Sequence, residues 1–158
     1  MTDPKPARTD AEFGRTLADF SVPSEPGNER LAMETVAESA KGLGFSGENL
    51  ERLKTAVAEA TMNAMEHGNH YRPELPVELQ VLVTDQDLLV RITDRGSGPP
   101  PKEDAEAPDL LAKLEGVQTP RGWGLFLIKS MVDEMNITGD EGHHMVELVV
   151  HLEAEGSK

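Results

Sequence analysis

The chain has 158 residues, a formal net charge of −14 and a hydrophobic content of 37%. This length suits a single domain whose core is large enough to fold unaided. Because cysteine is absent, disulfide frameworks, thiolate metal sites and cysteine nucleophiles are excluded. An acidic surface repels nucleic-acid phosphates, so we expect no direct nucleic-acid binding. The charge indicates either a basic protein partner or a solubility function alone.

No part of the sequence has the character of a membrane span, and its start does not have that of a signal segment. No apolar run approaches the ~20 residues that a membrane-spanning helix needs, and residues 1–10 are polar and proline-bearing rather than signal-like. We therefore expect a soluble, cytoplasmic protein that does not contact a membrane. Residues 1–12 and 153–158 are predicted to be disordered tails, which leaves residues 13–152 for the folded domain.

The first half of the chain predicts one strand followed by two helices. Residues 13–22 have the alternating character of a strand and end at a proline-rich break. Apolar residues near helical spacing predict a helix over about 28–41. Ser46 and Asn49 are both candidate caps for the next helix. The apolar stripe of that helix consists of Leu53, Val57, Ala60 and Ala64.

The second half predicts a hairpin, a lid, a helix and a strand. Two alternating runs within 77–93, joined by a short polar turn, predict an antiparallel hairpin that delivers Asp94 to a sheet edge. The proline-rich and acidic residues at about 99–120 cannot continue this sheet, and we interpret them as a mobile lid. Apolar spacing from Leu125 to Met135 predicts a further packed helix, and residues 145–152 predict a final strand.

This order of elements predicts the fold class. Strand, helix, helix, strand, strand, lid, helix and strand favour an α+β two-layer sandwich. In such a sandwich the helices cover one face of a mixed, mostly antiparallel sheet. Phe126, Ile128 and Met131 then read as core packing in preference to a partner-binding stripe.

Three polar side chains of the second predicted helix share one flank. Residues 59–69 read EATMNAMEHGN, and a helical wheel places Glu59, Asn63 and His67 in line beside the apolar stripe. Residues four apart on one helix face the same small volume. An isolated Glu/Asn pair of this kind is more often solvated. The glycine motifs downstream shift the interpretation to a binding site.

Two glycine motifs follow, DRGSG at 94–98 and RGWGL at 121–125. Gly96 and Gly98 would let the backbone approach a flat ligand, and the carboxylate of Asp94 accepts hydrogen bonds only. The second motif precedes a predicted helix, whose N-terminal amides form an anion site. Each motif alone is weak evidence, because Asp-x-Gly turns and glycines packed at helix starts are both common.

Taken in order, the three motifs resemble the ATP-binding domain shared by histidine kinases, type II topoisomerases and Hsp90. Within that group the chain is most similar to the anti-sigma-factor serine kinases of the RsbW type. The resemblance covers roughly residues 13–152 and implies a Bergerat-type ATP-binding fold. It also implies that Asn63 ligates Mg²⁺, that Glu59 is the catalytic base and that Asp94 contacts the adenine amino group. The other residues that it assigns to the nucleotide site are His67, Gly68, Gly96, Gly98, Arg121, Gly122, Gly124 and Leu125.

The resemblance further implies an ATP- and Mg²⁺-dependent serine/threonine protein kinase that acts as an anti-sigma factor. Such a protein binds a sigma factor, phosphorylates an anti-anti-sigma antagonist of the STAS type and forms a homodimer. One alternative is a nucleotide-dependent binding switch without phosphoryl transfer. A detached histidine kinase domain is disfavoured, because residues 1–50 contain no helix with a phosphoacceptor histidine.

The histidines raise two separate questions. Many relatives carry Gly-Thr near the last strand, whereas Gly142, His143 and His144 stand here. The adenine pocket is therefore expected to be altered, with Thr93 as a partial substitute for the missing hydroxyl. Zinc binding by these histidines together with His67 and His70 is disfavoured, because their spacing matches no familiar zinc pattern.

Overall fold

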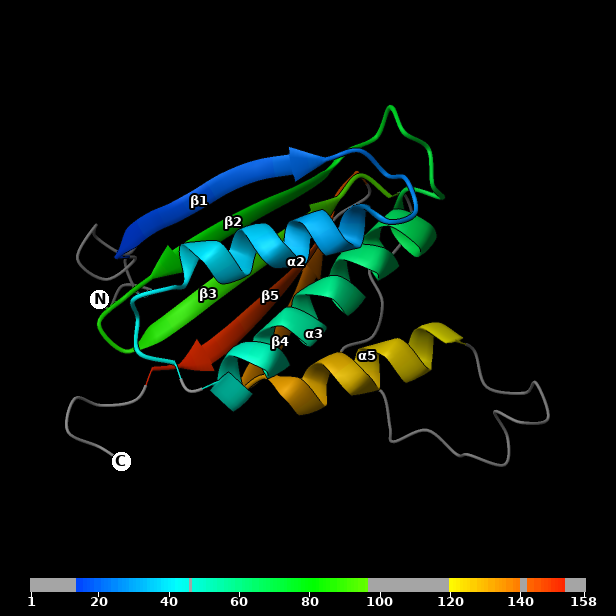
Figure 1. The fold of residues 1–158 in the computed structure, drawn as a ribbon. Coiled ribbons are helices and arrows are strands. Elements are labelled where there is room, and N and C mark those ends of the chain that lie inside the picture. Colours follow the sequence, from blue (N-terminus) through cyan, green and yellow to red (C-terminus); the bar gives the residue numbers. More distant parts are fainter. Residues whose placement is uncertain (1–13, 46, 97–119, 140–141, 153–158) are drawn as a thin grey trace, which may run out of the picture.

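The computed structural model describes residues 14–45, 47–96, 120–139 and 142–152. The predicted tails lie outside these residues, as does the predicted lid apart from Pro120 at its end. Three α-helices are described, and Figure 1 shows all of them on one face of the sheet. In chain order the elements are β1 Arg15–Val22, α2 Asn28–Ser39, α3 Gly47–Asn63, the π-helical turn η1 Ala64–Gly68, β2 Val77–Val83, β3 Asp87–Asp94, α5 Pro120–Met131, β4 Glu134–Gly139 and β5 His144–His151.

The sheet has five strands in the order β1-β2-β3-β5-β4. The predicted two-layer α+β sandwich is thus confirmed, but the sheet is not mixed, because every pairing among the described strands is antiparallel. A second correction concerns Asp94. The predicted hairpin placed it at an edge of the sheet, but it lies at the end of the central strand β3. This strand is central because it pairs with β2 on one side and with β5 on the other.

One strand was missing from the sequence prediction. The predicted helix that would have contained Met135 ends at Met131, and Met135 lies in β4. Met135 and Ile137 are two residues apart and both buried, which is the period of a strand. Met135 alone also lies at a helical distance from Ile128, seven residues away, so the apolar pattern up to Met135 favoured a longer helix.

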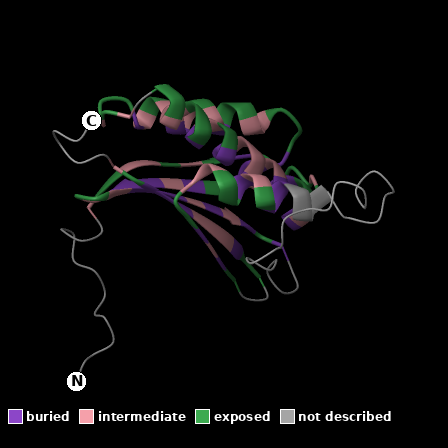
Figure 2. Ribbon diagram, turned by 90° about the horizontal axis from the view of Figure 1, so that it is seen from below, coloured by how far each residue is buried: buried purple, intermediate pink, exposed green. Residues whose placement is uncertain are grey.

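The core lies between the sheet and the helical layer, where Figure 2 places most buried residues. The four residues of the apolar stripe predicted for the second helix are all buried there, as expected: Leu53, Val57 and Ala60 of α3 and Ala64 of η1. From the sheet, alternate residues of β3 and β5 face the helices. They include Leu88, Val90, Ile92, Leu148 and Val150. Within the described residues, no helix is both long and apolar enough to cross a membrane.

The first prediction compares two leucines on neighbouring helices. Leu53 of α3 is 1% exposed, whereas Leu31 of α2 is 53% exposed. We expect Leu53→Ala to lower the free energy of unfolding by about 2–5 kcal/mol, because it removes transfer energy and leaves a cavity. Leu31→Ala should change it by no more than about 0.5 kcal/mol. Urea denaturation measures both, and equal losses would contradict the core described above.

Candidate functional site

Two helices meet at a glycine beside the predicted polar flank. Asn63 at the end of α3 is 8% exposed, and Glu59 one turn earlier is half-buried. A Cβ atom built on Gly124 of α5 would lie 2.7 Å from Glu59 Oε2 and 3.1 Å from Asn63 Nδ2. Real Cβ atoms essentially never approach as closely as 2.7 Å, so a side chain at residue 124 would have to displace the Glu59 carboxylate from its place beside Asn63.

The second glycine motif lies inside helix α5, whereas the sequence predicted it before the helix. Because α5 begins at Pro120, Gly122 and Gly124 lie within the helix and do not precede it. The first turn of a helix still has backbone N–H groups without intrahelical partners, and residue 122 belongs to that turn. Gly124 lies beyond it, and its observed role is the close packing against Glu59 and Asn63.

The environment of Glu59 shifts its ionisation. Partial burial raises the pKa of the Glu59 carboxyl above its ordinary value, and the negative charge of Glu66 raises it further. A carboxylate with a raised pKa is a stronger proton acceptor than an exposed glutamate. The site therefore places a group suited to accept a proton beside the buried amide of Asn63.

Asp94 and two glycines form a tightly packed corner at the end of β3. The Asp94 carboxyl group, 5% exposed, packs directly onto the Cα of Gly68, where any side chain would overlap it. Its Oδ1 accepts a hydrogen bond from the Gly96 N–H at 2.7 Å. A Cβ on Gly96 would lie 2.8 Å from the Gly68 carbonyl oxygen. The aspartate is thus held in place by backbone that approaches it from two segments.

A small, partly open pocket with a cavity volume of about 10 Å³ lies between α3, α5, β3 and β5. Its polar lining comes from Asn63, Asp94 and His144, which are all buried. The remaining lining is apolar and consists of Ala60, Ala64, Leu125, Ile128 and Val146. An apolar cleft with a few convergent polar groups is the usual form of a small-molecule site. The pocket brings together the predicted site residues Asn63, Asp94 and Leu125.

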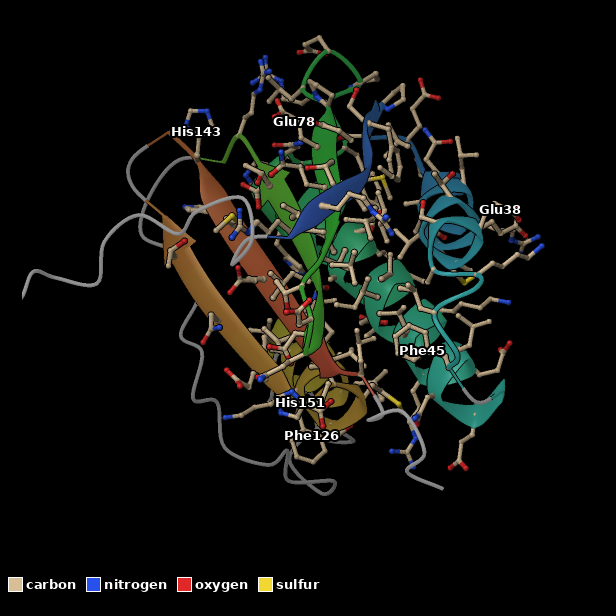
Figure 3. The ribbon with its side chains drawn as sticks, turned by 90° about the vertical axis from the view of Figure 1, so that its left-hand side faces the viewer. Glu38, Phe45, Glu78, Phe126, His143 and His151 are labelled. Atoms are coloured by element: carbon tan, nitrogen blue, oxygen red, sulfur yellow. The ribbon has the colours of Figure 1, made fainter. Side chains whose placement is uncertain are left out.

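His144 is a pocket residue to which the sequence assigned no role. It directly faces Asp94 across β3 and β5, and its Nδ1 lies 3.3 Å from Asp94 Oδ1. Thr93 cannot substitute here, because successive residues of a strand face opposite sides and Thr93 lies on the side away from the helices. The neighbouring His143 is exposed, and Figure 3 shows it at the same end of the sheet as Glu78.

Asn69 is a second residue whose role the sequence did not reveal. It is fully buried, and its Nδ2 donates to Ser24 Oγ at 3.0 Å and to the carbonyl oxygens of Leu75 and Pro76 at 2.9 and 3.2 Å. Its Oδ1 accepts a hydrogen bond from the Arg95 N–H at 2.8 Å. One side chain thus joins the segments after β1, before β2 and after β3. The only local signal in the sequence was an asparagine directly after Gly68.

The regular α-helix that the helical wheel assumed as far as His67 ends earlier, at Asn63. After Asn63 the chain continues as η1, and a π-helical turn is wider than an α-helical one. His67 lies in η1, half-buried, with Nε2 3.8 Å from Glu66 Oε1, and it does not line the pocket.

His70 and Tyr71 follow with φ values of 55° and 54°. Left-handed backbone at two consecutive residues of this kind is strained and is found most often near functional sites.

Some predicted residues fall beyond the structural description. Gly98 lies outside the described residues, and so do the side chains of Arg121 and Trp123. Among the residues that are described, no three His, Asp or Glu side chains form a group able to hold a metal ion. The Asn63 side chain carries an amide oxygen of the kind that a hard cation takes as a single protein ligand. Its buried Nδ2 has no hydrogen-bond partner in the described part of the chain, so no such bond fixes the amide.

Comparison with known proteins supports a nucleotide site. Residues 22–150 match the family described as the histidine kinase-like ATPase domain. An anti-sigma F factor of Anoxybacillus flavithermus is 33% identical over 135 residues, which cover 84% of this chain and 89% of the relative. A serine-protein kinase RsbW of Oceanobacillus iheyensis is 29% identical over 126 residues, which cover 78% and 80%. A serine-protein kinase RsbW of Listeria monocytogenes is also 29% identical and covers 80% and 82%.

Two solved structures share the fold. The RsbU and RsbW domains of a Mycobacterium tuberculosis protein match with a TM-score of 0.57 and 17% identity, over 85% of this chain and 32% of that one. The SiaB–SiaC complex of Pseudomonas aeruginosa contains a chain that matches with a TM-score of 0.60 and 12% identity, over 86% and 90%. The matches confirm the resemblance carried by the three motifs, and the names of the relatives class the chain with the protein serine kinases, as predicted.

The second prediction concerns Asn69. Asn69→Ala should lower the free energy of unfolding by about 2–4 kcal/mol, because it leaves the Arg95 N–H and the loop carbonyls without their partner. Asn28→Ala is the matched control. Asn28 makes one exposed hydrogen bond, to the Pro23 carbonyl, and its loss should cost under about 1 kcal/mol. Chemical denaturation compares the two variants, and equal effects would show that Asn69 does not hold the three segments together.

Proposed function

The chain belongs to the histidine kinase-like ATPase domain family, and we propose that it is a serine/threonine protein kinase that uses Mg·ATP and acts as an anti-sigma factor. It binds a sigma factor and phosphorylates an anti-anti-sigma antagonist of the STAS type. One observation carries the proposal. Glu59, with its raised pKa, and the buried Asn63 pack together against Gly124 beside a pocket that Asp94 lines.

The pocket suits the adenine of ATP. Its apolar lining from α3, α5 and the sheet is of the kind that packs against a flat ring, and the carboxylate of Asp94 accepts the hydrogen bonds that an amino group donates. Gly68 and Gly96 keep side chains away from this carboxylate. The phosphates then extend toward Asn63 and the first turn of α5, where unpaired N–H groups favour anions.

Asn63 is the residue that would hold Mg²⁺. Its amide supplies one oxygen, and Mg²⁺ needs only one or two protein ligands beside phosphate oxygens and water. Bound there, the cation would neutralise charge on the transferring phosphoryl group. Asn63 itself, at the junction of α3 and η1, fixes where the phosphates lie relative to Glu59.

Glu59 is the catalytic base of the proposed reaction. It accepts the proton of a partner's serine hydroxyl while the serine oxygen bonds to the γ-phosphorus and the bond to the β-phosphate oxygen breaks, releasing ADP. The raised pKa fits this step, because a better proton acceptor transfers the proton more readily. A binding switch without phosphoryl transfer would not require a carboxylate in this environment.

Charge and family support the choice of partners. Relatives bear the names anti-sigma F factor and serine-protein kinase RsbW. With a net charge of −14, the protein attracts a basic surface on a partner and repels nucleic acid, which fits an indirect effect on transcription through a sigma factor. As in the resembled family, the working unit proposed is a homodimer.

The third prediction tests catalysis by Glu59. Glu59→Gln keeps the shape of the side chain but removes the basic oxygen, so phosphorylation of an anti-anti-sigma protein should fall ~10²-fold or more. Binding of ATP should persist, because Asn63 and Asp94 are unchanged. Labelled ATP measures transfer, and calorimetry measures binding.

The matched control is Glu51→Gln. Glu51 lies on the same helix, where its exposed carboxylate pairs with Lys54 at 3.4 Å, so its loss should leave transfer unchanged. Transfer by Glu59→Gln at the wild-type rate would make Glu59 a solvated helix residue. Tight nucleotide binding by the wild type without transfer to any anti-anti-sigma protein of its source would favour the binding switch.

The fourth prediction uses the pKa of Glu59. A base must be deprotonated to work, so the transfer rate should rise with pH through this raised pKa. Glu66→Gln removes the negative charge that contributes to the shift, which lowers the pKa of Glu59. The acid limb of the pH–rate profile should therefore move to lower pH. Glu48 lies at the far end of α3, so Glu48→Gln should leave the acid limb of the profile at its wild-type pH. If Glu66→Gln also left the acid limb at its wild-type pH, that limb would not report the ionisation of Glu59.

A further inference from the structure

His144 occupies a position at which it can decide how Asp94 meets a ligand. The two residues face each other across β3 and β5, and on the other side His144 faces Gly139 of β4. A Cβ on Gly139 would lie 3.0 Å from His144 Cδ2. The small neighbour thus leaves room for the imidazole ring. Although histidine has a polar ring, His144 is only 4% exposed and lines the same pocket as Asp94.

The contact with Asp94 favours one tautomer of the ring. Nδ1 lies 3.3 Å from Asp94 Oδ1 in an electrostatic contact that does not have the geometry of a hydrogen bond, and a ring nitrogen that faces a carboxylate is suited to carry its proton there. The same oxygen accepts the Gly96 N–H. Oδ1 therefore accepts one hydrogen bond from its own loop and is faced by a ring nitrogen of the neighbouring strand, which can become a second donor. Such contacts are often long without ligand and shorten when it binds.

Two donors restrict the carboxylate more than one can. The terminal torsion of an aspartate side chain is broad, so a single hydrogen bond to Gly96 leaves the carboxylate free to turn about that bond. A second donor on another element sets the plane of the group. The orientation of the carboxylate matters because the site distinguishes adenine from guanine by how the hydrogen-bond donors and acceptors of the nucleotide base meet those of the protein.

We propose that His144 is a specificity-determining residue of the nucleotide base subsite, which holds the Asp94 carboxylate in the orientation that accepts the amino group of adenine. The proposal rests on the proposed function, since it presupposes that ATP occupies this pocket. It assigns to His144 the part in base recognition that the missing Gly-Thr pattern left open. Because His144 acts through Asp94, it is a positioning residue and takes no part in phosphoryl transfer.

The test compares two substitutions of equal shape. His144→Asn places an amide N–H close to the position of Nδ1, whereas His144→Leu has nearly the same volume and no donor. The Leu variant should bind ATP ~10-fold or more weakly, as expected for one lost hydrogen bond to a charged group, and its preference for ATP over GTP should shrink. The Asn variant should retain most of both. Isothermal titration with Mg·ATP and Mg·GTP measures these affinities.

Steady-state kinetics add a readout that a packing role would not produce. In the Leu variant the KM for ATP should rise while kcat at saturating ATP stays near the wild-type value, because Glu59 is untouched. Equal behaviour of the Asn and Leu variants would overturn the proposal, since both remove the ring but only one removes the donor. If the Leu variant does not fold, His144→Gln replaces it, because its longer side chain carries the amide beyond the position of Nδ1.

The wild-type protein separates this proposal from the function on which it rests. Wild-type protein that binds neither nucleotide would overturn the proposed function and the role of His144 together. The other outcome is that the wild-type protein binds ATP and the Leu variant binds it with the same affinity and the same preference over GTP. This result would overturn only the role of His144.

Discussion

Asn69 joins three segments that are distant in sequence, and the geometry of the site depends on the hydrogen bonds of this one buried side chain. It bonds to Ser24, to the carbonyls before β2 and to the Arg95 N–H directly after Asp94. The last of these sets the path of the chain at the end of the central strand. An asparagine suits the position because its amide donates and accepts at once, whereas an aspartate would turn an acceptor toward carbonyl oxygens.

Two glycines then allow the close approach that this anchoring imposes. Gly68, one residue before Asn69, lies directly against the Asp94 carboxyl group, and Gly124 of α5 lies against Glu59 and Asn63. In both places a hydrogen atom stands where a methyl group would displace a polar side chain of the site. The glycines that the sequence suggested for contact with a ligand thus also serve the packing of protein against protein, and a ligand motif and a packing motif look the same in sequence.

The local parts of the site could be predicted from sequence, and the long-range parts could not. Glu59 and Asn63 share one helix, so their spacing alone placed them together. His144 meets Asp94 only through the register of β3 and β5, across some fifty residues of chain, and no periodic pattern encodes such a register. β4 was missed for a related reason, since Met135 fits the helical spacing from Leu125 and Ile128 as well as the period of a strand, and only pairing with β5 selects the strand.

The contact between α3 and α5 links the shape of the site to its chemistry. Burial is the larger cause of the raised pKa of Glu59, and Glu59 lies against Gly124, so the helix that narrows the site also helps to keep water from this carboxyl. A base in such a place is strongest while α5 is packed on α3. Any partner or ligand that changed the packing of α5 would alter the pKa of Glu59 together with the room beside Asn63, and binding and proton transfer would then change in step.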